Sequence, residues 1–204
     1  MGLRSKLLEM PLVYDLLQNG LSRSESREWF VKQVIRPKTG QRILDIGCGT
    51  ASVLNQLDGV RYTGIDHNPE YISKAREQFG DRGEFICTDI CDMQLERTEQ
   101  FDVVLMLRVL HHLPDDAVSE MIQMIPSILN GGGEMITLDC ALADGQHPIA
   151  WLLAKLDRGR YARSPQRYRE LLETHFELET EIVRHDLLKV PYTHAIFRAT
   201  PKVS

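Results

Sequence analysis

The sequence predicts an α/β fold in which helices cover both faces of a doubly wound, mostly parallel sheet. Three observations lead to this prediction. Short apolar runs alternate with helical patterns from residue 41 onward, a glycine-rich turn follows the first run, and two strand-like runs without an intervening helix end the chain. Such alternation is typical of a parallel sheet covered by helices. The two final runs should form an antiparallel hairpin at the sheet edge.

The segment before the sheet is expected to form an N-terminal cap of two helices, because apolar side chains recur at helical spacing within residues 1–35. The second helix should end at Arg36, since Pro37 disfavours helical backbone in the preceding residue and Gly40 favours a turn. Five strands are expected next, at Arg42–Ile46, Arg61–Asp66, Gly83–Cys87, Phe101–Leu107 and Gly133–Asp139. Helices should begin near Ala51, Asn68 and Pro114.

The rest of the chain departs from this rhythm. Helices are expected over Ile149–Asp157 and Gln166–His175. Ser164 has the side chain of an N-cap residue, and Pro165 suits the first helical position after it. The two final strand-like runs are Phe176–Val183 and Tyr192–Ala199.

The composition is that of a globular chain, with 43% hydrophobic and 26% charged residues among 204. A formal net charge of −5 disfavours nucleic acid as a partner, because proteins that bind it present a positive surface. No run approaches the roughly 20 apolar residues of a membrane helix, so we expect a cytoplasmic protein with no membrane partner. The four cysteines form no CxxC pair, so we expect reduced thiols and no metal site.

The glycine-rich turn is the most informative stretch of the sequence. Asp45 closes the first strand, and Gly47 and Gly49 allow a tight turn and a close approach of the backbone to a ligand. A dinucleotide is disfavoured, because Ser52 stands where its fingerprint requires glycine and Asp45 would repel a pyrophosphate. A ligand with a positive end and a ribose suits Asp45 together with Asp66, which closes the second strand. The alternatives are a turn that binds nothing and an Asp66 that only caps a helix.

Four segments in order resemble the motifs of class I S-adenosylmethionine-dependent methyltransferases, within them the small bacterial type 11/12 enzymes. The segments are Ile43–Ala51, Asp66, Cys87–Ile90 and Phe101–Pro114. The likeness implies a Rossmann-like, seven-stranded sheet in a single domain, residues 1–204. Within it we expect an N-terminal helical cap at 1–40, a cofactor-binding core at 41–139, and substrate-side helices with the terminal hairpin at 140–204.

The resemblance implies S-adenosyl-L-methionine as the cofactor. Asp45 and the turn would lie by the methionine moiety, Asp66 would hold the ribose, and Asp89 would meet the adenine amino group. The cofactor-binding residues expected by resemblance are Asp45, Gly47, Cys48, Gly49, Asp66, His67, Asp89, Ile90 and Leu107. Ala51 replaces the third glycine that is usual in the family. We expect it to reduce clearance without abolishing binding.

The residues after the fourth strand carry the candidate chemistry. His111 and His112 are the catalytic candidates, each either as a general base or as part of the cofactor pocket. Candidate substrate-binding residues are Arg108, Asp139, Arg158, Arg160 and Tyr192. Arg158 and Arg160 belong to the segment Lys155–Arg169, which contains six basic residues and one acidic residue. That segment either recognises an anionic substrate or is a solvated helix face whose arginines pair with nearby acids.

The sequence therefore predicts an enzyme that transfers a methyl group to an oxygen or nitrogen of a small, anionic or sugar-linked molecule. The alternative is a non-catalytic subunit that binds S-adenosylmethionine or regulates a partner, which Ala51 and the uncertain base leave open. A nicotinamide dehydrogenase is disfavoured by Ser52 and Asp45. The sequence does not identify the acceptor, because one scaffold hosts many chemistries, and it predicts no oligomeric state.

Overall fold

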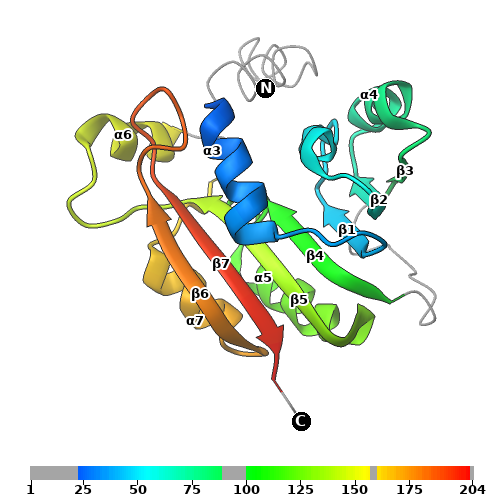
Figure 1. The fold of residues 1–204 in the computed structure, drawn as a ribbon. Coiled ribbons are helices and arrows are strands. Elements are labelled where there is room, and N and C mark those ends of the chain that lie inside the picture. The colour runs from blue at the N-terminus through cyan, green and yellow to red at the C-terminus, as the bar shows by residue number, and fades with distance from the viewer. Residues whose placement is uncertain (1–22, 89–99, 157–159, 203–204) are drawn as a thin grey trace.

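The computed structural model describes residues 23–88, 100–156 and 160–202 (Figure 1). Seven strands form one sheet in the order β3-β2-β1-β4-β5-β7-β6. All run parallel except β7, which pairs antiparallel with both β5 and β6. The predicted doubly wound sheet with a C-terminal antiparallel hairpin is thus confirmed. The strands are β1 Arg42–Ile46, β2 Arg61–Asp66, β3 Gly83–Cys87, β4 Phe101–Leu107, β5 Leu129–Cys140, β6 Phe176–Arg184 and β7 His194–Pro201.

The first four strands have the predicted bounds, but β5 begins at Leu129, earlier than expected. Gly131 and Gly132 precede the predicted strand, which begins at Gly133, but they belong to β5, whose register against β4 shifts between Phe101 and Val103. Asn130 donates a hydrogen bond from Nδ2 to Oδ1 of Asp102 at 2.7 Å and fixes this irregular pairing. Glycine accommodates such a bulge without a side-chain clash.

The helices differ more from the prediction than the strands do. α3, Ser24–Trp29, continues directly into a π-helix, η1, Phe30–Ile35, which ends where Arg36 adopts a left-handed conformation with φ of 51°. The helix expected near Ala51 is a short 3-10 helix, η2, Ser52–Gln56. The first expected N-terminal helix lies outside the described residues. The other helices are α4 Pro69–Phe79, η4 Leu110–His112, α5 Asp115–Met124, η5 Ile125–Ile128, α6 Pro148–Leu156 and α7 Pro165–Leu172.

Helices cover both faces of the sheet (Figure 1). α5 and α7 pack on one face through buried side chains such as Ile122, Tyr168 and Leu172. η1, η2 and α4 pack on the other face through Ile35, Leu54 and their neighbours. Because β1, β2, β4 and β5 run parallel, their carboxyl ends lie at one edge of the sheet. The loops that carry the candidate residues follow these ends and meet there.

Candidate active site

The glycine turn after β1 has the conformation that the sequence predicts. Gly47 and Gly49 have φ of 70° and 57°, a region that favours glycine. A Cβ built at Gly47 would lie 2.6 Å from Cγ2 of Val109, so no larger residue fits. Between the glycines, Cys48 donates its N–H to the carbonyl of Ile65 at 2.9 Å and ties the turn to β2. Burial raises the pKa of the Cys48 thiol, so it stays neutral.

The carboxylate of Asp66 joins the end of β2 to this turn. Gly49 donates its N–H to Oδ2 of Asp66 at 2.9 Å, and Asn68 donates its N–H to Oδ1 at 2.8 Å. Each carboxylate oxygen keeps a further lone pair for a ligand hydroxyl. The neighbouring His67 side chain is 81% exposed, with Nδ1 3.7 Å from Oδ1 of Asp66. Asp66 thus both shapes the turn and stands at its rim.

Asp45 is the most perturbed carboxyl of the site. It is 2% exposed, and Tyr62 donates a hydrogen bond from Oη to its Oδ2 at 2.6 Å. Its Oδ1 is buried and accepts no hydrogen bond from any described residue. Burial raises the pKa of Asp45 to about 7, although the Tyr62 hydrogen bond and the charge of Arg108 oppose this. Such a group gains most from a cationic ligand.

A pocket of about 90 Å³ opens beside the turn. Its walls come from α3 and η1, from η2, from the carboxyl ends of β4 and β5, and from the segment before β7. Of the predicted site residues it includes Leu107 and Arg108. The other lining residues that matter below are Arg27, Phe30, Leu138 and His194.

Contacts between distant parts of the chain close one side of this pocket. Arg23 donates from its N–H to the carbonyl of Leu187 at 3.4 Å, and Ser26 donates from Oγ to the carbonyl of Asp186 at 3.4 Å. The guanidinium of Arg184 lies 4.3 Å from the ring centre of Trp29. α3 and the loop between β6 and β7 therefore form one wall.

The candidate bases lie on η4, outside the pocket lining. Nδ1 of His111 is 2.8 Å from Oδ1 of Asp139, which also accepts the His111 backbone N–H at 3.2 Å. His111 is only 3% exposed, whereas His112 is exposed and its ring centre lies 4.1 Å from that of His111. Leu138 faces the pocket, and the next residue along β5 faces the opposite side of the sheet. Asp139 thus binds His111, where the sequence suggested substrate.

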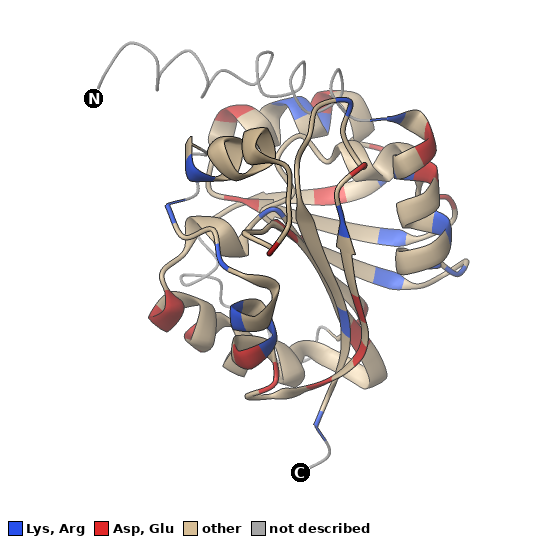
Figure 2. Ribbon diagram, turned by 90° about the vertical axis from the view of Figure 1, so that its left-hand side faces the viewer, with Lys and Arg blue, Asp and Glu red and all other residues tan. Residues whose placement is uncertain are grey.

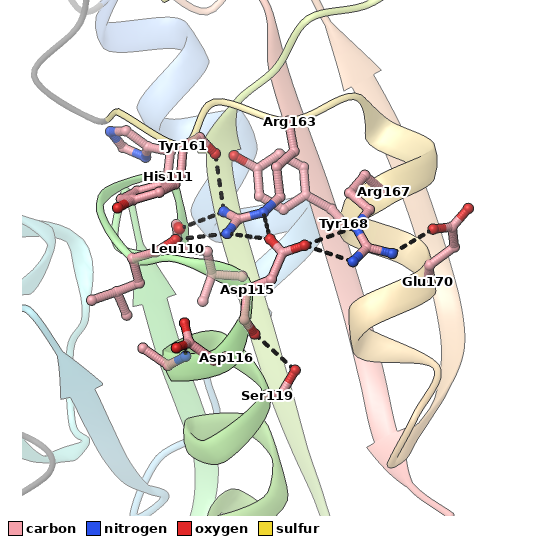
Figure 3. Close-up of polar contacts among 12 residues, drawn as sticks. Leu110, His111, Asp115, Asp116, Ser119, Tyr161, Arg163, Arg167, Tyr168 and Glu170 are labelled. Carbon is pink, nitrogen blue, oxygen red and sulfur yellow. Dashed lines mark hydrogen bonds and ion pairs between the residues drawn. The ribbon is translucent and has the colours of Figure 1, made fainter.

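Ion pairs engage part of the basic segment Lys155–Arg169, at Arg163 and Arg167 (Figure 3). Arg163 donates to the carbonyls of Leu110 at 2.8 Å and Leu113 at 2.6 Å, and to Oδ1 of Asp115 at 2.7 Å. Arg167 binds the other oxygen of Asp115 at 2.6 Å. These hydrogen bonds lower the pKa of Asp115.

The alternative that these arginines pair with nearby acids therefore holds for Arg163 and Arg167, and also for Arg169, which pairs with Glu181 at 2.5 Å. Acidic and basic positions are interspersed over the ribbon (Figure 2). Arg160 is exposed. Arg158, like Asp89 and Ile90, lies outside the described residues.

Several pocket residues were not predicted as site residues. One of them is His194, whose ring centre lies 5.1 Å from that of Tyr192; the predicted residue Tyr192 is half-buried and is not among the lining residues. Strand alternation was the available signal for His194. No sequence signal was available for Arg27, Gln56 and Leu187, because only the packing of α3 and η2 against the loop after β6 brings them together.

Comparison with known proteins identifies the central part of this fold. Residues 43–133 match the model of a family described as a methyltransferase domain. By this match, the segment is similar to methyltransferase domains. The match spans the turn after β1, the end of β2 and η4, which are the segments that carried the resemblance, and it confirms that resemblance.

Two curated relatives align with about half of this chain. A ubiquinone biosynthesis O-methyltransferase of Xylella fastidiosa (strain 9a5c) is 31% identical over 104 residues, which are 48% of this chain and 42% of that protein. One of Stutzerimonas stutzeri (strain A1501) is 32% identical over 101 residues, which are 47% and 43% of the two chains. The chain thus aligns with less than half the length of these relatives.

Solved structures share the fold of residues 43–133 and of the elements around them. A TehB-like S-adenosylmethionine-dependent methyltransferase from Corynebacterium glutamicum superposes with a TM-score of 0.70 at 17% identity, over 98% of this chain and 100% of that one. The N-methyltransferase NodS from Bradyrhizobium japonicum WM9, solved with S-adenosyl-L-homocysteine, has a TM-score of 0.68 at 16% identity, over 88% of this chain and 87% of that one.

Within residues 23–88, 100–156 and 160–202, no helix is long and apolar enough to cross a membrane.

Proposed function

We propose that the protein transfers the methyl group of S-adenosyl-L-methionine to an oxygen or nitrogen of a small, anionic or sugar-linked molecule. One observation carries this proposal: the Asp45 and Asp66 carboxylates flank a glycine turn inside a segment that matches the methyltransferase family. Relatives named as O-methyltransferases and a structural neighbour named as an N-methyltransferase support the two acceptor atoms.

The residues around the turn suit this cofactor. The buried, unpaired Oδ1 of Asp45 is an acceptor for the ammonium of the methionine moiety. The Gly47–Gly49 backbone would flank that moiety, and Asp66 would accept the ribose hydroxyls. By resemblance, Asp89 and Ile90 would hold the adenine. When bound, the cofactor supplies a methyl group on a positively charged sulfur.

The contribution of the chain to such a reaction is mainly orientation and the exclusion of water. The pocket begins at Leu107 and Arg108, where β4 ends, and apolar residues such as Phe30 and Leu138 line it. The wall formed by α3 and the loop after β6 covers it on one side. A methyl acceptor bound in this pocket would lie beside the glycine turn with little water around it.

A base is required only if the acceptor must lose a proton during the reaction. We propose His111 and His112 as the candidates. When Nδ1 of His111 donates to Asp139, its Nε2 is left as the acceptor, which is the tautomer a base requires. We expect His111→Ala or His112→Ala to lower turnover by about 10²-fold or more and to change the pH dependence of turnover. Unchanged profiles in both variants would remove the histidines from the chemistry.

The proposal is tested first by calorimetric titration with S-adenosylmethionine, S-adenosylhomocysteine and NAD, after mass spectrometry has shown that no ligand is already bound. Micromolar or tighter binding of the two adenosyl ligands, without binding of NAD, is the expected result. Screening of phenols, amines and anionic sugars for methylated products then tests catalysis. Binding without any product would favour the non-catalytic alternative, and no binding by the folded protein would contradict the proposal.

A further inference from the structure

The pocket beside the turn has an unusual charge for an acidic protein. Its thirteen lining residues include Arg27, Arg108 and His194 but no aspartate or glutamate. The full chain carries a formal net charge of −5. Most of the remaining lining side chains are apolar, including Phe30 and Leu138. Charge and shape together favour a ligand with an apolar body and a negative group.

Arg108 stands out among these residues. Its φ of 64° lies in the left-handed region, which non-glycine residues rarely adopt outside turns and functional sites. Its backbone N–H donates to the carbonyl of Leu138 at 2.6 Å, which holds this conformation against β5. The side chain lines the pocket, and its buried Nε donates to no described residue. The strained backbone therefore presents a guanidinium donor that the surrounding protein does not satisfy.

The nearby acid does not satisfy this donor either. Burial raises the pKa of Asp45 and the charge of Arg108 opposes this rise, so the two groups interact, but Oδ1 of Asp45 accepts no hydrogen bond from any described residue. Arg163 offers the contrast, because its guanidinium is fully engaged by Asp115 and backbone carbonyls. Of these two arginines, only Arg108 lines the pocket.

We infer that Arg108 binds the carboxylate of the methyl acceptor, and that the acceptor is an apolar or aromatic acid whose body lies against Phe30 and Leu138. Guanidinium groups bind carboxylates in a two-point geometry that fixes orientation, which methyl transfer requires. This inference rests on the proposed function. The same chemistry would also suit the carboxylate of the methionine moiety, so the test separates these two sources.

The test compares benzoate with its neutral analogue benzamide as probes. Each is titrated into the full chain, with and without saturating S-adenosylhomocysteine, and S-adenosylhomocysteine is titrated separately. The variant is Arg108→Gln, and the matched control is Arg61→Gln, because Arg61 is exposed where β2 begins, at the other end of the sheet. Thermal unfolding checks that both variants are folded.

The expected result is that the parent chain prefers benzoate to benzamide by about tenfold, as for a charged hydrogen bond. Arg108→Gln should lose this preference and keep its affinity for S-adenosylhomocysteine, while Arg61→Gln changes neither. A parent chain without the preference, or a variant that retains it, would overturn the inference. So would a variant that loses affinity for S-adenosylhomocysteine alone, because Arg108 would then hold the cofactor. Failure of the parent chain to bind S-adenosylhomocysteine would instead contradict the proposed function. In that case, the preference for benzoate measured without S-adenosylhomocysteine would still decide the role of Arg108.

Discussion

At the scale of single residues, a few backbone conformations and carboxylates define the candidate site. The sequence pointed to Asp45, Gly47, Gly49 and Asp66 from their place after apolar strands, and the structure brings them together around one turn. The sequence could not indicate that the backbone of Arg108 is left-handed, because that conformation depends on the hydrogen bond to Leu138 of a neighbouring strand.

Asp66→Ala should weaken binding of S-adenosylmethionine by about 1–3 kcal/mol, the cost of leaving polar groups without a partner. The loss has two origins, since the Gly49 N–H of the turn also loses its acceptor. Calorimetric titration measures it. Asp58→Ala is the control, because the Asp58 side chain is 95% exposed. Unchanged affinity in the Asp66 variant would remove this residue from the site.

Ala51→Gly should leave cofactor binding intact and change the free energy of unfolding by less than about 1 kcal/mol. Ala51 has a φ of 56°, which glycine adopts without strain, but it is fully buried and its methyl group packs in the core. Relief of backbone strain would stabilise the variant, whereas the lost packing and the greater freedom of glycine in the unfolded chain would destabilise it. Urea unfolding and titration measure the outcome. Loss of binding would show that the Ala51 methyl group supports the site.

At the scale of elements, strands were easier to predict than helices. β1, β2 and β4 follow from their apolar runs, because the residues of a strand buried on both faces are themselves mostly apolar. The π-helix η1 and the extended β5 did not follow, since a register shift against β4 and the packing of η1 on the sheet decide them. Ion pairing likewise decided the role of Arg163, Arg167 and Arg169 within the basic segment.

Arg163→Leu should destabilise the protein by about 3 kcal/mol, because Arg163 is buried and ties η4 to the segment before α7 through two carbonyls and Asp115. Arg167→Leu is the matched control, since it pairs with the same carboxylate but is about half exposed. It should cost less than about 1 kcal/mol. Urea unfolding gives both values. Equal losses would mean that Arg163 is no more than a surface ion pair.

At the scale of the whole molecule, the sheet brings a buried carboxyl and an arginine to one edge of an otherwise apolar core. The site thereby affects global stability, because Asp45 must be taken out of water when the chain folds. The pairing of α3 with the loop after β6 also closes the pocket only in the complete fold.

The contribution of Asp45 to the free energy of unfolding should fall as pH rises from about 4 to about 7. Its folded pKa of about 7 lies above the ordinary value of 3.8, so between these pH values the folded chain keeps a proton that the unfolded chain has lost. The contribution is full below about pH 4 and is lost above about pH 7, with a steepest slope of about 1.4 kcal/mol per pH unit.

The measurement is urea unfolding of the parent chain and of Asp45→Asn at several pH values. The difference between the two isolates Asp45 from carboxyls such as Asp115, whose lowered pKa acts in the opposite direction. The variant should gain stability relative to the parent chain across this range. A constant difference would show that Asp45 keeps an ordinary pKa in the folded chain.

The sequence by itself determined the α/β class, most strand bounds, the glycine turn and the two acids beside it. These features depend on local periodicity and on residues adjacent in the chain. Tertiary structure decided that Arg163 is a structural ion-pair residue, that Asp139 binds His111, and that Arg108 faces a pocket without acids. The physical reason is that burial and pairing of a charge depend on groups far away in the sequence, as Arg163 and Asp115 illustrate.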